Sequence, residues 1–304
     1  MDIYLDTNLW NELCDQAVDP ARITESLSSL DARLVLGTHC VYEMAKTFRT
    51  PGSGATKRAK DLFLYLGKFV EAGIPCAKET MELLAAEMWA LKWHVSTINP
   101  LLSSSDTVKV MQEVFKLASG TFDEKADSFI EQRIAAAETS RREQRNYLDR
   151  RPDRKEKLRT VRLEHLERWL EDETKTVTGA ALLAGHIQRQ FPEAPPTEVS
   201  EWAAALIALP NYRLARGLVR ADLYYNWRCA HRNSNPKDLL DDMFHVLNAI
   251  YCDVYATKES GQAAYTGYLL TSRTKVAIYD GQVGADCWLG TLASGIVSPT
   301  KVTD

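Results

Sequence analysis

Several features that identify common protein classes are missing from this chain of 304 residues. Its six cysteines lie far apart and form no Cys-x-x-Cys pair, which argues against a typical zinc site and against a disulfide framework. The longest wholly apolar stretch, at about residues 203–209, is far shorter than the ~20 residues of a membrane span. An acidic residue, Asp2, stands where a signal peptide carries a basic region. We therefore expect a cytoplasmic protein with no membrane partner.

A strong excess of charge of either sign is also absent. The 37 basic and 41 acidic residues give a net charge of −4, so any nucleic-acid partner needs a local basic patch. Hydrophobic residues make up 45% and charged residues 26%, which indicates a folded globular chain and not a disordered one. The length suits two domains, or one domain that carries a large insertion.

Strand signals occur only near the two ends of the chain. Short apolar runs followed by turn residues lie at 3–5 and 34–36, and further strand patterns with a helix between them lie at 253–257 and 275–279. Such alternation of strand and helix predicts an α/β fold with a central parallel sheet. The expected parts are one α/β domain built from residues 1–77 and 234–304, and an all-α insertion at residues 78–233.

The middle of the chain follows the periodicity of helices and offers no strand of its own. Pro152 suits a helix start or a kink in this region. Four tryptophans lie on apolar helical stripes there, and we expect them in the core: Trp89, Trp93, Trp169 and Trp202.

Carboxylates follow the predicted strands at the edge where a parallel sheet binds its ligands. Asp6 comes directly after the first strand, and Glu43 lies in the first helical turn after the second. Asp241 and Asp242 open the helix that leads into the third strand, so this helix begins at the same edge, and Glu259 follows that strand. Converging carboxylates repel one another unless a cation is present. Oxygen donors without a cysteine or histidine cluster suit Mg²⁺ or Mn²⁺.

Helical geometry separates the two adjacent aspartates. The apolar stripe of their helix includes Leu239, Met243 and Leu247. At 100° per residue, Asp242 lies at the border of this stripe, whereas Asp241 points nearly opposite to it. Asp242 is therefore the preferred ligand, and Asp241 is the alternate.

Three neighbouring polar residues are expected to support the carboxylates: Asn8, His245 and Thr257. His245 follows Asp242 by about one helical turn, and a supporting or packing role is preferred for it over metal ligation. Thr257 has helix capping as an equally ordinary alternative. Asp6 and Glu43 also have ordinary alternatives, as a helix cap and as an acid favoured by the helix dipole.

Residues 3–8 resemble the opening of the PIN (PilT N-terminus) domain family of metal-dependent nucleases. Residues 41–45 resemble the second acidic motif of that family, and residues 242–245 and 251–257 are similar to its third motif and the following strand. The resemblance covers both ends of the chain and not the middle. It implies a three-layer α/β/α fold, three or four acidic ligands, Mg²⁺ or Mn²⁺, and in most members RNA cleavage.

The chain departs from the family pattern in its helical insertion and at the fourth acidic position. Lys258 stands directly after the 253–257 strand, where an Asp is common, and Glu259 is then the preferred fourth carboxylate. Asp253 is the alternate ligand. It begins its strand, which at ~3.3 Å per residue places it roughly 13 Å from the carboxyl edge, so we expect a structural role for it.

Two groups of basic residues are candidates for contact with nucleic acid. Residues 141–159 hold nine basic and four acidic residues, a local charge of +5 that suits a phosphate backbone. The second group shares one helical face beside aromatic residues, which suits single-stranded nucleic acid. A solvated charged helix and ordinary core packing are the respective alternatives. The candidates are Arg141, Arg142, Arg145, Arg213, Arg216 and Arg220.

These patterns favour a metal-dependent endoribonuclease. Its catalytic residues would hold one or two Mg²⁺ or Mn²⁺ ions, and water activated by the metal would attack an RNA phosphodiester. Two alternatives stay open: a catalytically weak PIN-like scaffold that binds RNA or a protein, and a structure-selective DNA nuclease. The sequence does not decide whether an antitoxin, another protein or a second copy of the chain is a partner. The expected catalytic and metal-binding residues are Asp6, Glu43, Asp242 and Glu259.

Overall fold

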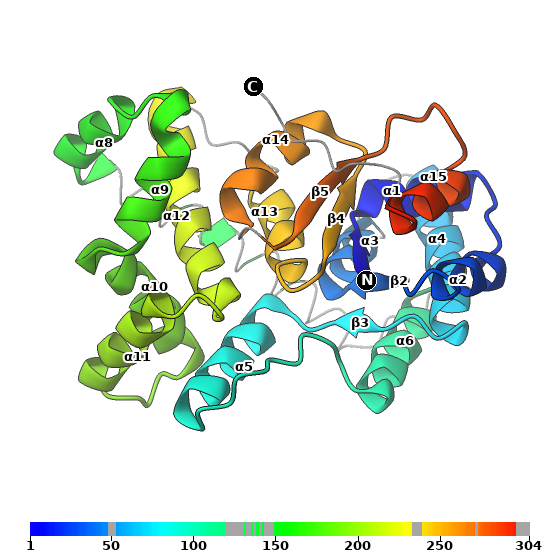
Figure 1. Ribbon diagram of the computed structural model, residues 1–304, viewed down its shortest axis with the longest axis horizontal. Helices are drawn as coiled ribbons and strands as arrows, with labels where there is room; N and C mark the ends of the chain where they lie inside the picture. The colour runs from blue at the N-terminus through cyan, green and yellow to red at the C-terminus, as the bar shows by residue number, and fades with distance from the viewer. Residues whose placement is uncertain are drawn as a thin grey trace.

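The structure is a computed structural model that describes residues 1–47, 53–118, 149–232, 239–270 and 273–295, together with residues 131, 135, 138, 139 and 142. Its strands are β1 (Asp2–Leu5), β2 (Arg33–Gly37), β3 (Cys76–Ala77), β4 (Val254–Thr257) and β5 (Lys275–Ile278). They form one five-stranded sheet in the order β3-β2-β1-β4-β5, with every pair parallel (Figure 1). The expected α/β fold with a central parallel sheet is confirmed.

The first strand of the chain occupies the middle of the sheet and joins the two ends of the sequence. Ile3 pairs with Leu34 of β2 on one side and with Val254 of β4 on the other. Ile3, Tyr4 and Leu5 are fully buried, as is typical of a parallel strand that helices cover on both faces. The sequence did not predict β3, because two residues are too few to show a periodicity.

Helices cover both faces of the sheet. They are α1 (Thr7–Asp15), α2 (Pro20–Ser28), α3 (Thr38–Thr47), α4 (Ser53–Glu71), α13 (Leu239–Asn248), α14 (Ser260–Leu269) and α15 (Ala285–Ala293). On one face α1, α2, α4 and α15 pack together, and on the other face α13 packs against α14 (Figure 1). Helix α3 contacts both α4 and α13, and so links the two groups.

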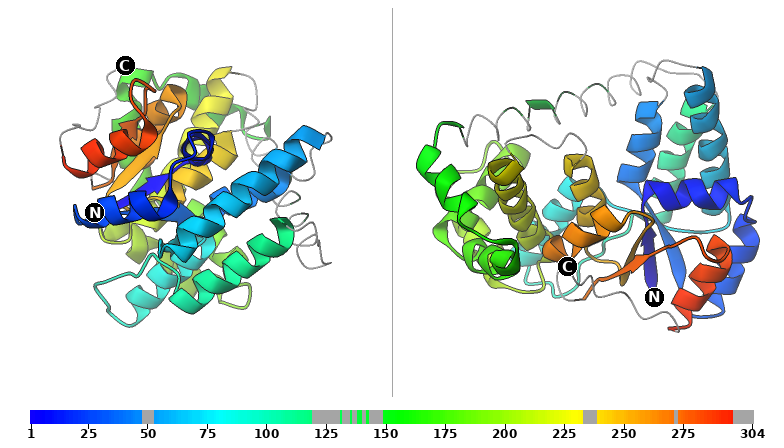
Figure 2. Two further views of the ribbon diagram at one scale, coloured as in Figure 1. Left: turned by 90° about the vertical axis from the view of Figure 1, so that its right-hand side faces the viewer. Right: turned by 90° about the horizontal axis from the view of Figure 1, so that it is seen from above.

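The described residues between β3 and α13 form helices and connecting loops and contain no strand beyond an isolated bridge of Leu101 to Ala77. The helices are α5 (Thr80–Lys92), α6 (Ser104–Ala118), α8 (Pro152–Arg159), α9 (Leu166–Thr174), α10 (Val177–Gln190), α11 (Pro196–Ala208) and α12 (Arg213–Arg232), with a 3₁₀ turn η1 (Leu163–His165) before α9. Pro152 is the first residue of α8, as expected. Helix α6 packs on α4, whereas α8 to α12 lie together at the opposite end of the molecule (Figure 2). The division into an α/β domain and one insertion stays a prediction.

Helix α12 connects this helical group to the sheet. It contacts α5, α13 and α14 as well as the helices α8 to α11. Gly217 allows the close approach to α13, because a Cβ atom there would lie 2.4 Å from Cδ1 of Ile250 and 3.0 Å from Cδ2 of Leu247. The face of α13 opposite the sheet is therefore covered by α12.

The start of α12 is capped by a carboxylate from α5. Fully buried Glu87 accepts hydrogen bonds from the backbone N–H groups of Leu214, at 2.6 Å, and Ala215, at 2.8 Å. The Tyr251 hydroxyl also donates to Glu87. Burial raises the pKa of Glu87 to about 7, although these hydrogen bonds oppose the increase. A helix N-terminus thus receives an acidic partner from a distant segment of the chain.

Two tryptophans expected in the core lie at the surface instead. Trp89 and Trp93 are 59% and 60% exposed. Their rings stack on each other with centroids 6.1 Å apart, while α5 turns Leu83, Leu84 and Glu87 inward. Helix α5 is apolar nearly all round, so its composition does not identify the buried face. The other two are partly buried against the core: Trp169 and Trp202.

No helix in the described part of the chain is long and apolar enough to cross a membrane.

Candidate functional site at the carboxyl edge of the sheet

The candidate site lies where the strand order reverses. From β1 the chain crosses to β2 and then β3 in one direction, whereas β4 lies on the other side of β1 and leads outward to β5. In open parallel sheets, ligands bind beyond the carboxyl ends of the two strands at such a switch point. Here these strands are β1 and β4, which Asp6 and Thr257 terminate.

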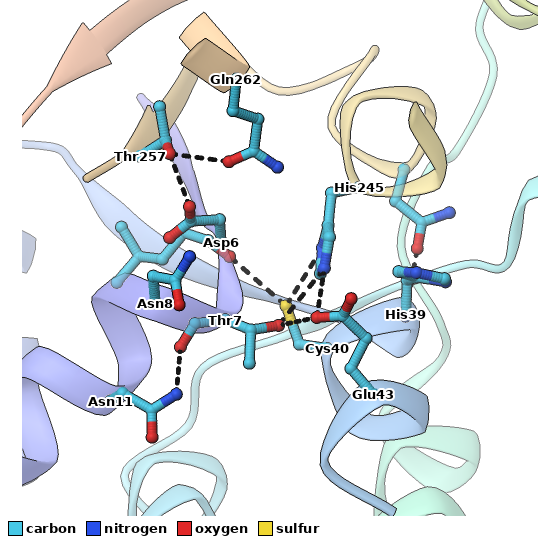
Figure 3. A network of polar contacts seen from close by, with 12 residues as sticks. Asp6, Thr7, Asn8, Asn11, His39, Cys40, Glu43, His245, Thr257 and Gln262 are labelled. Atoms are coloured by element: carbon cyan, nitrogen blue, oxygen red, sulfur yellow. Dashed lines mark hydrogen bonds and ion pairs between the residues drawn. The ribbon is translucent and has the colours of Figure 1, made fainter. Parts of the chain in front are cut away.

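Asp6 is buried between these two strands (Figure 3). Its Oδ1 accepts a hydrogen bond from the backbone N–H of Leu9 at 2.8 Å and thereby caps α1. Its Oδ2 accepts from the Thr257 hydroxyl at 2.5 Å. Burial raises the pKa of Asp6 to about 6, against the lowering effect of both hydrogen bonds. Asp6 is thus both a helix cap and a member of the site, two roles that the sequence presented as alternatives.

Thr257 links Asp6 to α14. Its fully buried hydroxyl lies 2.8 Å from Oε1 of Gln262 and accepts a hydrogen bond at 3.0 Å from the backbone N–H of Glu259. The residue therefore supports the Asp6 carboxylate and shapes the turn into α14 at the same time. The N-cap of α14 is Glu259, and Thr257 accepts from the backbone N–H of that residue.

Glu43 and His245 form an ion pair across α3 and α13 (Figure 3). The Nε2 atom of His245 lies 2.7 Å from Oε2 of Glu43, and the Thr7 hydroxyl donates to the same oxygen at 2.6 Å. Burial acts to raise the pKa of Glu43, but His245, His39 and Thr7 outweigh it and lower the pKa to about 2. Glu43 lies in the second turn of α3 and not the first, because α3 begins at Thr38.

His245 is buried and held on both sides of its ring. Its Nδ1 atom lies 3.1 Å from the Tyr4 hydroxyl and 3.7 Å from Sγ of Cys40. Burial alone lowers the pKa of His245, but Cys40 and Glu43 outweigh this effect and raise the pKa well above its ordinary value. The supporting role expected for His245 therefore includes a direct contact with a candidate ligand.

Asp242 lies at the start of α13, half-buried beside Tyr265. Burial raises its pKa to about 6, Glu259 and Glu43 add to the increase, and Tyr265 and His245 oppose it. Because the charges of Glu259 and Glu43 act on Asp242, these three carboxylates are electrostatic neighbours. The side chain of Asp241, the alternate ligand, lies outside the described residues.

Glu259 completes the acidic group from the N-terminal end of α14. Its side chain is exposed, it accepts a hydrogen bond from Nδ2 of Asn8, and its charge acts to raise the pKa of both Asp6 and Asp242. Lys258 turns away to an ion pair with Glu12. An open pocket of about 440 Å³ adjoins this end of the site, lined by Asn8, Asn11, Glu12, Asp15, Arg58, Lys258 and Glu259.

Asp253 lies at the amino edge of the sheet, as its position in the sequence predicted. Its Oδ2 accepts a hydrogen bond from the backbone N–H of Asp2 at 2.7 Å, and Asp2 in turn pairs with Arg33. The residue joins β1 to β4 at the end of the strands opposite the acidic group. A structural role accounts for it.

The three candidate arginines of α12 bind groups of the protein itself. Arg216 and Arg220 both pair with Glu171 of α9, and Nε of Arg220 donates to the backbone oxygen of Tyr268 at 2.6 Å. Arg213 donates to the backbone oxygen of Ile250. Core packing, the alternative considered for this group, therefore agrees better with the geometry than contact with nucleic acid does.

Of the other basic candidates, Arg142 is exposed, whereas Arg141 and Arg145 lie outside the described residues.

The sequence did not identify several side chains that complete the site. Tyr4 and Cys40 contact His245, Gln262 contacts Thr257, and the His39 ring lies at right angles to that of His245 with centroids 4.6 Å apart. His39 alone had a local signal, because it lies four residues before Glu43 and so shares one face of α3. Searches of protein-family models, curated proteins and solved structures find no match to the chain.

Proposed function

We propose that this protein is a metal-dependent nuclease of the PIN-like type that cleaves RNA. One observation carries the proposal: at the switch point of a parallel sheet, the charge of Glu259 acts on both Asp6 and Asp242, and the charge of Glu43 acts on Asp242. Burial and neighbouring carboxylates raise the pKa of two of them, Asp6 and Asp242, to about 6. Such a concentration of acidic groups at a ligand-binding edge is typical of a site that holds cations.

The donor chemistry of the acidic group suits Mg²⁺ or Mn²⁺, although among the described residues only His39, Glu43 and His245 bring three ligand atoms within 4.8 Å of one another. Within the described part of the chain, only Glu43 of the four carboxylates has an ion pair, with His245. Asp6, Asp242 and Glu259 have no such partner among those residues, and the nearby Lys258 is paired with Glu12. These three carboxylates, together with Glu43, offer the oxygen donors that Mg²⁺ and Mn²⁺ prefer.

The chain's own residues hold the acidic group in place. Leu9 and Thr257 hold the Asp6 carboxylate through both of its oxygens. Thr7 and His245 hold Glu43, while Asn8 orients Glu259 from the start of α1. When bound, a divalent cation activates water and offsets the charge of a phosphodiester in its reaction. No side-chain nucleophile is required for this chemistry.

The choice of RNA as substrate rests on the resemblance of residues 3–8, 41–45 and 242–257 to PIN domains. The same acidic arrangement also suits cleavage of DNA. Matched RNA and DNA substrates therefore belong in the first experiment.

The experiment is cleavage of a fluorescent single-stranded RNA, and of DNA of the same sequence, with Mn²⁺, Mg²⁺ or EDTA. Wild type is compared with Asp6→Asn, Asp242→Asn and Asp253→Asn, the last as a matched control at the opposite edge of the sheet. We expect metal-dependent RNA cleavage, a loss of at least ~100-fold in both site variants, and retention in the control. Preferred cleavage of DNA would instead identify a DNA nuclease. A wild type that cuts neither substrate, and whose melting temperature does not rise with metal, would refute the proposal and favour a binding scaffold.

A further inference from the structure

A histidine-containing group adjoins the acidic residues and shares one of them. His39, Glu43 and His245 each offer a ligand atom, and these atoms all lie within 4.8 Å of one another. Both histidines are buried, whereas the Glu43 side chain is 25% exposed. We propose that this group is a separate binding site for a divalent transition-metal ion of the zinc or cobalt class. The inference does not depend on nuclease activity.

Local geometry places two of the three ligands on one helix face. His39 and Glu43 lie four residues apart on α3, so their side chains project from the same side of the helix. His245 approaches from α13, and its Nε2 atom faces the Glu43 carboxylate at 2.7 Å. Two residues at this spacing on one helix, with a third ligand from elsewhere, form a common arrangement for transition metals.

The chemistry of the donors separates this group from the acidic site. Two imidazoles, which are borderline donors, together with one carboxylate favour Zn²⁺, Co²⁺ or Fe²⁺ over Mg²⁺. Three protein ligands also leave coordination positions open for water or another ligand. By contrast, Asp6, Asp242 and Glu259 provide oxygen alone. We therefore expect different ions to prefer the two groups, which meet at Glu43.

The surrounding residues already orient the ligands. Tyr4 lies 3.1 Å from Nδ1 of His245, and this contact directs the opposite nitrogen toward Glu43. Thr7 donates to Oε2 of Glu43. In known metal sites, such contacts to the far side of a ligand fix its orientation and contribute to metal affinity.

Asn248 fixes the two helices that carry the ligands. Its Oδ1 accepts hydrogen bonds from the backbone N–H of His39 at 3.2 Å and from the Thr38 hydroxyl at 3.3 Å. Its Nδ2 donates to Thr80 at the start of α5. The start of α3 is thus attached to the end of α13, which holds His39 and His245 on facing elements.

Packing is the competing explanation for the two histidines. The His39 ring contacts Tyr42 and Phe244, and His245 pairs with Glu43 without any metal. A purely structural role predicts no saturable metal binding at these residues. A metal site predicts one ion per chain, bound in place of the proton that lies between His245 and Glu43.

The test uses Co²⁺, because its visible absorption reports nitrogen and oxygen ligation. Metal-free full-length protein is titrated with Co²⁺, followed by Zn²⁺ or Mg²⁺ as competitor. The variants are His39→Gln and His245→Gln, with His186→Gln as the matched control, since His186 also lies 2.8 Å from a carboxylate, that of Asp222. Circular dichroism verifies that each variant is folded.

We expect one saturable Co²⁺ per chain that Zn²⁺ displaces and Mg²⁺ does not. Each of the two ligand variants should weaken binding by at least ~10–100-fold, and the control should bind like wild type. Asp6→Asn should retain the Co²⁺ signal even where it abolishes RNA cleavage, which separates this site from the proposed nuclease. The absence of saturable Co²⁺ binding in wild type would overturn the inference. So would a signal that Asp6→Asn removes and His39→Gln retains.

If both ligand variants fail to fold, the wild-type protein still tests whether the metal site exists. An anomalous diffraction map of Co²⁺-soaked crystals should place the ion between His39, Glu43 and His245. A peak among Asp6, Asp242 and Glu259 alone would refute the inference.

Discussion

Replacing Asp6 with asparagine should stabilise the metal-free protein near neutral pH. Asp6 is 1% exposed, and its burial raises the pKa of its carboxyl from 3.8 to about 6. Asparagine has the same shape without the charge. Its Oδ1 can accept from the backbone N–H of Leu9, and its Nδ2 can donate to Thr257. The Thr257 hydroxyl then has Gln262 as an acceptor, 2.8 Å away.

The magnitude follows from the two pKa values. A carboxyl whose pKa is higher in the folded state makes its full contribution to stability at low pH, where it is protonated in both states. The contribution disappears as the pH rises from about 4 through 6. A difference of about 2.2 units corresponds to about 3 kcal/mol in the free energy of unfolding. For a chain of 304 residues this is a change of roughly 5 °C in the melting temperature.

Urea denaturation in EDTA, repeated between pH 4 and pH 8, measures this effect. The free energy of unfolding of Asp6→Asn minus that of wild type should increase by about 2.5 kcal/mol between pH 4 and pH 8, since at pH 4 the unfolded carboxyl, with its pKa of 3.8, is already partly ionised. The constant differences between the two side chains cancel in this slope, which leaves the titration of Asp6 and its coupling to Glu259 and His245. If this difference does not change with pH, the pKa of Asp6 is the same in the folded and unfolded states, and the reasoning is refuted. Saturating Mn²⁺ should then stabilise wild type and not the variant.

Three further predictions concern stability and are measured by urea denaturation. Gly37→Ala should lower the free energy of unfolding by roughly 1–3 kcal/mol or more, because the added Cβ atom would lie 2.0 Å from the Tyr4 hydroxyl. A variant as stable as wild type would contradict this close approach. Between pH 4.5 and pH 8, the free energy of unfolding of wild type should fall by about 3 kcal/mol relative to that of Glu87→Gln, because burial raises the pKa of Glu87 to about 7. If the stabilities of both proteins change equally with pH, this burial cost is refuted. Glu171→Gln should lower the free energy of unfolding by about 1–3 kcal/mol, because it leaves Arg220, which is 7% exposed, without its carboxylate partner. Glu164→Gln, at an exposed ion pair, is the control and should have almost no effect.

Local patterns predicted a parallel sheet and the strand ends that four carboxylates follow, although they missed the two-residue strand β3 and placed Glu43 one helical turn too early. Apolar runs and turn residues mark the ends of β1, β2 and β4, and parallel strands present their carboxyl ends at one edge. Asp6, Glu43 and Glu259 follow from this rule, and Asp242 follows from it together with the helical geometry that separates it from Asp241. The same rule places Asp253 at the opposite edge, where its side chain binds the backbone of Asp2.

Contacts between distant helices could not be predicted in this way. The sequence shows that α5 is apolar, but only packing decides that Glu87 turns inward to cap α12 while Trp89 and Trp93 stay exposed. It shows arginines on one face of α12, but their pairing with Glu171 depends on where α9 lies.

This difference between the features that local patterns predicted and the contacts that they did not predict has a physical reason. Periodicity and turn chemistry act over a few residues, so the sequence by itself determined the order of strands and helices and the edge at which the acidic residues lie. Many partners of the buried polar side chains come instead from elements that are about 200 residues or more away in the sequence, as for Glu43 with His245 and Asp6 with Thr257. Glu43 therefore has His245 as its partner, and His245 has Tyr4, only because α3, α13 and β1 meet in the folded protein. Tertiary structure decided those contacts, and with them the lowered pKa of Glu43 and the raised pKa of His245.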